Sequence, residues 1–206
     1  GLNLTDINGD DEAAAFDING EMVAIAFISV PVPWGDIHDT AQYAYNWVTA
    51  EKDLEHHTGH AIVSIMTDRK GAVERFQILS KLLCSILMTT TSVGIYQGNQ
   101  SLLIPRDQYL ENVNLLKEDK IPVLAWIYIG LRESEKGNSA YTYGLTSFEK
   151  QEIEIVNSKM ELEELHSFLA NIALYVIGND IIFKADQTIG STPEQKIKIT
   201  SSKGKF

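Results

Sequence analysis

Cysteine is almost absent from this sequence, and its scarcity excludes two kinds of site. The single cysteine, Cys84, rules out a disulfide framework within the chain and any metal cluster that needs several thiolates. Cys84 lies in an apolar run with helical spacing, where a thiol packs as a small hydrophobic side chain more often than it acts as a nucleophile. We therefore expect a structural cysteine.

Long hydrophobic runs are also missing. The longest, residues 22–30 and 122–129, are much shorter than the roughly 20 residues that a membrane-spanning helix needs. No signal peptide is visible, which predicts a soluble, cytoplasmic protein. The chain begins with Gly1 rather than with methionine, as a trimmed N-terminus would, so the question of a preceding export signal stays open.

Positive charge is in short supply. The chain has 17 Lys and Arg against 28 Asp and Glu, a formal net charge of -11 and a pI near 4.8. Such a chain repels nucleic-acid phosphates and anionic membranes, so we expect neither as a partner, and a protein with a basic surface fits the charge better. The densest basic stretch is residues 196–205, where Lys196 and Lys198 alternate with isoleucines as along an edge strand.

Three motifs that mark large enzyme classes are absent. The sequence has no Gly-x-Ser-x-Gly of the serine hydrolases, no Gly-x-x-x-x-Gly-Lys that cradles phosphates and no dinucleotide-binding fingerprint. We therefore expect no cofactor, and the residues do not assemble a complete catalytic set that would indicate an enzyme.

What the sequence does contain is the composition of an ordinary folded protein, with 44% apolar and 22% charged residues. Residues 1–12 are polar and are expected to form a flexible N-terminal segment. Residues 13–206 are long enough to bury a core as a single α+β domain, with two small domains as the alternative.

Hydrophobic spacing predicts the elements of this domain. Asn19-Gly20 between two apolar runs is a strong hairpin signal, and Ser158-x-x-Glu161 is a capping box that begins a helix closed by Gly178. The predicted helices are 36–48, 71–88, 105–116 and 162–176, and the predicted strands are 14–18, 22–30, 61–66, 93–96, 121–129, 140–143, 152–156 and a final antiparallel pair, 181–183 with 196–199.

The order of these elements favours an α+β fold with a mixed, mainly antiparallel sheet and helices packed mostly on one face. The helices are too irregularly spaced for repeated β-α-β units. Each half of the chain ends in strands after a long helix, so a duplicated ferredoxin-like arrangement is an alternative.

The densest group of candidate ligands is a histidine-rich loop, residues 55–60, ahead of a predicted strand. His57 and His60 could share a metal ion, with Glu55 or Asp53 as a further ligand. The sequence lacks a His-Glu-x-x-His pattern, however, and a hydrogen-bonded histidine at the start of an apolar strand is common. Structural or solvated histidines are the favoured interpretation, and a metal site is the alternative.

Two other segments have the composition of binding loops. Residues 141–148, with Tyr143 and Gly144, are rich in hydroxyls and aromatic rings, which suits a ligand or partner but suits a β-turn with a packed aromatic side chain better. Asp186 and Thr188 could place a carboxylate and a hydroxyl beside a site, and a tight turn explains them equally well.

Several short fragments follow one another along most of the chain. They are Pro31-Val32-Pro33-Trp34, Trp47, His57-x-x-His60, Gly94-Ile95-Tyr96, Trp126-Ile127, Thr142-Tyr143-Gly144-Leu145, Phe148, Glu152 and Asp186-x-Thr188-Ile189-Gly190. In their order and spacing they resemble an uncharacterised, mainly bacterial family, the domain of unknown function indexed four-two-six-one. The resemblance implies an α+β domain and no activity, since the family has no established one. Family members tend to have glycine where this chain has Glu149 and Ala185, so we expect both turns to be built differently here.

Two hypotheses about function follow. The first is a non-catalytic interaction domain, such as an accessory or immunity-type protein, whose acidic surface meets a basic partner. The second is an enzyme or metal-dependent binder centred on His57 and His60, with Glu152 or Asp186 brought near by the fold. We favour the first, because a complete catalytic set usually leaves more than one recognisable fragment.

Overall fold

Asn19-Gly20 forms the turn of a β-hairpin in the computed structural model, which describes residues 2–190 and 196–206. Both turn residues have positive φ angles, 52° for Asn19 and 93° for Gly20, as the two-residue turns favoured in hairpins require. The turn joins β2 (Ala13–Ile18) to β3 (Glu21–Ile28), so the predicted hairpin is confirmed.

Two further strands extend this hairpin into a sheet with the order β1-β2-β3-β4. β1 (Leu4–Gly9) pairs antiparallel with β2, and β4 (His60–Ile65) pairs antiparallel with β3. β1 lies in the segment that we expected to be flexible; its side chains are all exposed, so no apolar alternation marks it in the sequence. Its register shifts between Thr5 and Asn8, at a bulge where Asp6 has a φ of 53°.

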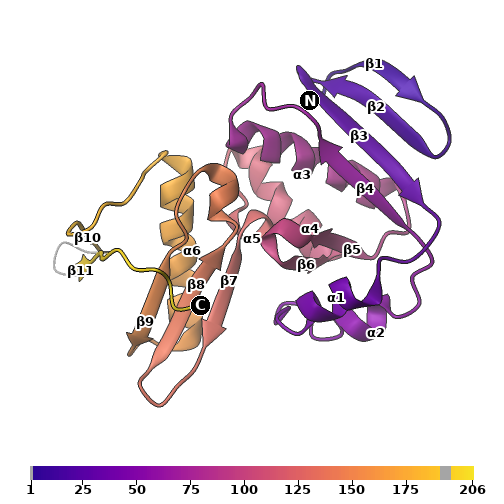
Figure 1. The fold of residues 1–206 in the computed structure, drawn as a ribbon. Helices are drawn as coiled ribbons and strands as arrows, with labels where there is room; N and C mark the ends of the chain where they lie inside the picture. The colour runs from indigo at the N-terminus through magenta and orange to yellow at the C-terminus, as the bar shows by residue number, and fades with distance from the viewer. Residues whose placement is uncertain (1, 191–195) are drawn as a thin grey trace. The chain divides into compact units, whose positions relative to one another are not determined.

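One face of this sheet is covered by α3 (Ala72–Thr89), which agrees closely with the helix predicted over 71–88 (Figure 1). The buried residues of the core between them are Phe16, Ile18, Val23, Ile78 and Leu82. Because successive side chains of a strand point to opposite faces, the residues that alternate with these along β2 and β3, such as Asp17 and Met22, point away from α3.

Several other elements lie before Tyr128, and some of them contribute to a second core. These elements are α1 (Trp34–Ala41), α2 (Ala50–Leu54), β5 (Gly94–Gln97), β6 (Leu102–Pro105), α4 (Arg106–Val113), α5 (Val123–Trp126) and the 3-10 turns η1 (Gly98–Gln100) and η2 (Asn114–Glu118). α1, α2 and β6 contribute to the second core, which consists of Ile37, Ala44, Trp47, Ala50, Leu54 and Leu103. β5 and β6 form an antiparallel pair, of which only β5 was predicted, because a four-residue strand ending in proline carries little strand signal.

The prediction of a strand over 121–129 is wrong in its first half. Residues Val123–Trp126 form the helix α5, and the strand β7 covers Tyr128–Arg132 instead. An unbroken apolar run has no periodicity that separates a strand from a buried helix. Pro122 stands immediately before the helix, a place where a proline is well tolerated.

Contacts between residues divide the chain into unit 1 (Gly1–Tyr128) and unit 2 (Ile129–Phe206). The sheet of unit 2 has the order β7-β8-β9, with β8 (Asn138–Tyr143) joined to β9 (Glu154–Ser158) through the 3-10 turn η3 (Leu145–Phe148). α6 (Leu162–Gly178) packs on β8.

The helix predicted over 162–176 is confirmed, but its predicted capping box does not form. Ser158 ends β9, and its hydroxyl oxygen accepts a hydrogen bond from the Met160 N–H instead of capping the helix. Glu161 is the residue that precedes α6. The Ser-x-x-Glu spacing fits the motif, but the chain is still extended at Ser158, the last residue of β9.

The final strand pair is shifted from its predicted position. β11 (Ile197–Lys198) pairs with β10 (Thr188–Ile189), not with residues 181–183. Backbone hydrogen bonds between Ile199 and the residues Asp186 and Gln187 continue this pairing beyond the strands. Ile181 and Phe183 line a groove instead.

The α+β class is confirmed, with the strands distributed over four small sheets rather than one. The strand registers that the structure resolves are all antiparallel. In the two larger sheets, strands that are consecutive in the chain lie side by side, which differs from the β-α-β-β-α-β order of a ferredoxin-like unit. No helix among the described residues is both long and apolar enough to cross a membrane.

Candidate functional site

The two candidate metal ligands of unit 1 are both hydrogen-bonded to the same backbone segment. Nε2 of His57 accepts a hydrogen bond from the Val32 N–H at 2.8 Å, and its Nδ1 donates to the Leu54 carbonyl at 2.6 Å. Nδ1 of His60, the first residue of β4, donates to the Val30 carbonyl at 2.9 Å. The histidines therefore fasten the connector that follows β3 to the loop that precedes β4.

This arrangement leaves few nitrogen or oxygen atoms that could coordinate a metal ion. Both ring nitrogens of His57 are in use, so coordination would require one backbone hydrogen bond to break. Asp53, another candidate ligand, accepts hydrogen bonds from the Thr49 hydroxyl at 2.6 Å and the Trp47 indole at 2.8 Å, and these bonds hold its pKa below the usual value. Within residues 2–190 and 196–206, no three His, Cys, Asp or Glu side chains are grouped closely enough to hold a metal.

Tyr143, Gly144 and Glu152 are brought together in unit 2. The Glu152 carboxylate accepts hydrogen bonds from the Thr142 hydroxyl at 2.7 Å, the Gly144 N–H at 2.9 Å and the Thr146 N–H at 3.2 Å. Gly144 has a φ of 116°, which a residue with a side chain rarely adopts. Glu152 thus holds the turn after β8 in place, and Tyr143 beside it is 46% exposed.

Asp186 and Thr188 line an open groove of unit 2. Its walls come from α6, through Phe168 and Tyr175, and from the following segment, through Phe183. Asp186 forms an ion pair with Lys198 at 2.7 Å, but both side chains are largely exposed to solvent. Neither Glu152 nor Tyr143 is among the groove residues described, so the sites predicted in unit 2 are two separate places.

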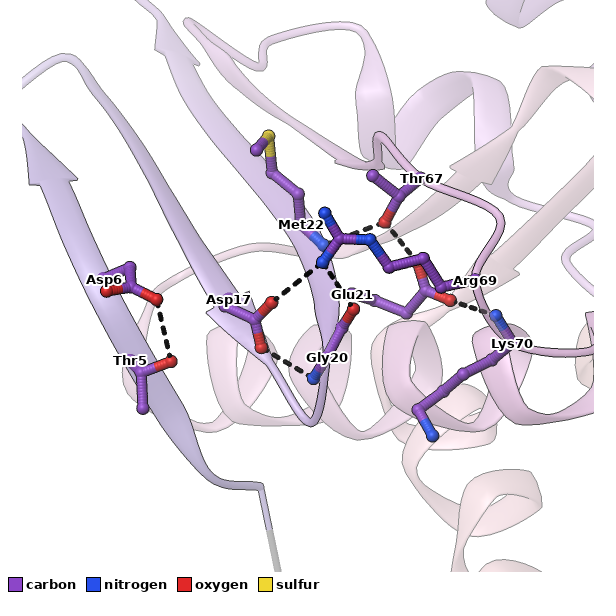
Figure 2. A network of polar contacts seen from close by, with 9 residues as sticks. All are labelled: Thr5, Asp6, Asp17, Gly20, Glu21, Met22, Thr67, Arg69 and Lys70. Atoms are coloured by element: carbon purple, nitrogen blue, oxygen red, sulfur yellow. Dashed lines mark hydrogen bonds and ion pairs between the residues drawn. The ribbon is translucent and has the colours of Figure 1, made fainter.

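A buried carboxylate that sequence reasoning missed lies at the start of β3. Glu21 is 0% exposed, and its carboxylate accepts hydrogen bonds from the Thr67 hydroxyl and from the Lys70 N–H, just before α3 (Figure 2). Burial alone would raise the pKa of Glu21. The hydrogen bonds from Thr67 and from the backbone of Lys70 and Arg69, together with the positive charge of Arg75, outweigh burial and lower that pKa.

The neighbouring residues complete this network. Arg69 forms an ion pair with Asp17 at 3.6 Å and donates to the Gly20 carbonyl at 3.1 Å (Figure 2). Asp17 also accepts from the Gly20 N–H at 2.6 Å. The network ties the hairpin turn to the N-terminal end of α3, which is a structural role. Strand alternation was the signal that could have found Glu21, because it lies on the same side of β3 as Val23.

Negative charge is unevenly distributed between the two units. Unit 1 has 17 Asp and Glu against 8 Lys and Arg, whereas unit 2 has 11 against 9. The first 51 residues contain nine Asp and Glu and no Lys or Arg. Asp6, Asp10, Asp11 and Glu12, on β1 and on its connection to β2, are all exposed. The acidic surface expected from the composition is therefore largely a property of unit 1.

Comparison with known proteins adds one result. Residues 141–206 match the family Domain of unknown function (DUF4261). The matched segment runs from β8 to the end of the chain and contains Glu152, Asp186 and Thr188, and over it the predicted resemblance is confirmed. No curated protein and no solved structure matches the chain.

The structure shows the backbone at one of the two positions where family members tend to have glycine. Glu149 follows η3 with a φ of 59°, the left-handed conformation that glycine adopts at least cost. The turn that we expected to differ therefore has a backbone suited to glycine, with a glutamate in the left-handed position.

Proposed function

We propose that this chain is a non-catalytic protein-interaction domain, of the accessory or immunity type, and that unit 1 binds a partner with a basic surface. The observation that carries this proposal is the concentration of negative charge in unit 1, where acidic residues outnumber basic ones by 17 to 8. A negatively charged surface attracts a positively charged protein over several ångströms, and this attraction raises the rate of association.

The fate of the predicted site residues also supports this proposal. The side chains of His57, Asp53 and Glu152 all form hydrogen bonds with the backbone or side chains of this chain. A catalytic group needs an atom that can reach a substrate, and a nucleophile needs a base beside it. Cys84 does not meet that need, since burial raises the pKa of its thiol.

The experiment that tests this proposal is capture from an extract of the native host, with the full chain as bait. Binding driven by charge should be strong at about 0.1 M salt and weak at about 1 M, because the Debye length falls from about 10 Å to about 3 Å. The protein captured should be basic and should be identified by mass spectrometry.

A pair of double variants makes the test specific. Asp11→Asn with Glu12→Gln removes two exposed charges from unit 1, and Glu133→Gln with Glu135→Gln removes two exposed charges from unit 2. Charges at the rim of an interface act mainly on the association rate, so the first pair should slow binding of the captured protein and the second should not. An absence of any salt-sensitive basic partner would contradict the proposal.

A further inference from the structure

The sheet of unit 1 has a second face, opposite to α3, and the strand registers define its residues. Ala13 lies opposite Ala26, which in turn lies opposite Ile62, and directly opposed residues of antiparallel strands share a face. We call this the outer sheet face. Its residues are Ala13, Ala15 and Asp17 of β2, Met22, Ala24, Ala26 and Ile28 of β3, His60, Ile62 and Ser64 of β4, and Met66, whose N–H continues the pairing to Met22. β1 adds Thr5 and Asn8, which lie opposite Asp17 and Ala15.

The middle of this face is apolar, and its larger apolar side chains are exposed. Met22 is 46% exposed, Ile62 is 50% exposed and Met66 is 61% exposed, whereas Val23, on the α3 side of the same strand, is 0% exposed. Figure 2 shows the Met22 side chain leaving the strand on the side opposite to the buried Glu21. A sheet face in contact with water normally carries polar residues in alternation with the core residues. Contiguous exposed apolar residues of this kind mark a surface that binds another molecule.

The charges around the outer sheet face indicate what kind of molecule that is. Asp17 lies on the face itself, opposite Met22, and the turn with Asp10, Asp11 and Glu12 borders it at the β1–β2 end. Arg69 is already paired with Asp17. A second copy of this chain would bring an acidic rim against an acidic rim, which is repulsive, whereas Lys and Arg around an apolar centre would complement it.

We infer that the outer sheet face is the docking surface for a basic protein that presents an apolar centre flanked by Lys or Arg. This inference rests on the proposed function and adds the location of the interface. The alanines in the middle of the face have short side chains, so a partner can approach the sheet closely, and Met22, Ile62 and Met66 supply the larger contacts. Methionine adapts its shape to such contacts.

Two methionine variants test this location. Met22→Lys places a positive charge on the outer sheet face, and Met88→Lys makes the same change at an exposed methionine near the end of α3. Both raise the net charge by the same amount, so a difference between them reports position. With the captured basic protein, Met22→Lys should raise the dissociation constant at least about tenfold, because it replaces a large apolar contact by a charge that repels a basic partner, and Met88→Lys should leave the constant unchanged.

Further measurements separate failure of the inference from failure of the proposed function. Ile62→Lys should reproduce the Met22→Lys result, and circular dichroism should show both variants folded. If Asp11→Asn with Glu12→Gln slows binding but the Met22 and Ile62 variants bind normally, the proposed function stands and the docking surface is wrong. If light scattering shows a wild-type dimer that Met22→Lys dissociates, the occupant is a second copy and the inference is overturned. If wild type captures no basic protein, both fail.

Discussion

Replacing Glu21 by glutamine should lower the free energy of unfolding of unit 1 by about 2 kcal/mol. The carboxylate is buried and has an acceptor oxygen for each of two donors, the Thr67 hydroxyl and the Lys70 N–H. A glutamine has a single carbonyl oxygen, so it satisfies one donor and turns an amide N–H toward the other. A buried polar group left without its partner costs about 1–3 kcal/mol.

The loss should depend on pH with a definite sign. The pKa of Glu21 is lower in the folded chain than its ordinary value of 4.5. A carboxylate with a lowered pKa contributes stability that is fully present above the unfolded pKa and is lost as the pH falls through the folded pKa. The difference in stability between wild type and Glu21→Gln should therefore be constant at neutral pH and should shrink in acid, below about pH 4.5.

Urea denaturation followed by tryptophan fluorescence measures this loss, because Trp34, Trp47 and Trp126 all lie in unit 1. Glu74→Gln is the matched control. The Glu74 side chain is 59% exposed and pairs with Lys70 on the helix surface at 3.5 Å, so its replacement should cost at most about 0.5 kcal/mol. Equal losses for the two variants, or a Glu21→Gln loss that does not change between about pH 7 and about pH 3, would refute the reasoning.

Three other substitutions have defined outcomes. His57→Ala should lower the free energy of unfolding by about 1–3 kcal/mol, because the Val32 N–H and the Leu54 carbonyl lose their partner. Zinc should leave the melting temperature of the wild type unchanged, and a rise in that temperature would instead support a metal site. Glu149→Gly should raise the free energy of unfolding by about 0.5–1 kcal/mol in thermal denaturation, whereas Glu135→Gly, at a residue without a positive φ, should give no gain. Glu152→Ala should cost about 1–2 kcal/mol in urea denaturation, and an unchanged midpoint would mean that the Gly144 turn holds without it.

The sequence predicted the elements whose patterns are local. The hairpin at Asn19-Gly20 depends on the preference of two adjacent residues for positive φ, and α3 depends on an apolar stripe within 18 residues. Both were predicted within two or three residues of their ends. β1 and α5 were not, because the first has no buried side chain and the second no polar residue to show its period.

The roles of the candidate site residues were harder to predict, because their hydrogen-bond partners are distant in sequence. His57 meets Val32, which is 25 residues away, and Glu21 meets Lys70, which is 49 residues away. No local pattern contains such pairs, so the roles of these side chains depend on how strands and helices pack. The pairing of Glu152 with Gly144 spans only 8 residues, and there the segment was identified but the role of the glutamate was not.

The bulge in β1 has a consequence for how this protein behaves at high concentration. The exposed apolar outer sheet face favours association with other apolar surfaces. A regular edge strand beside it would let molecules pair strand to strand into fibres. β1 interrupts that template, because its register breaks between Thr5 and Asn8 and Asp6 places a carboxylate at the break. At the β1 edge the sheet is therefore a poor template for pairing with another strand, while its exposed apolar face stays available to another protein.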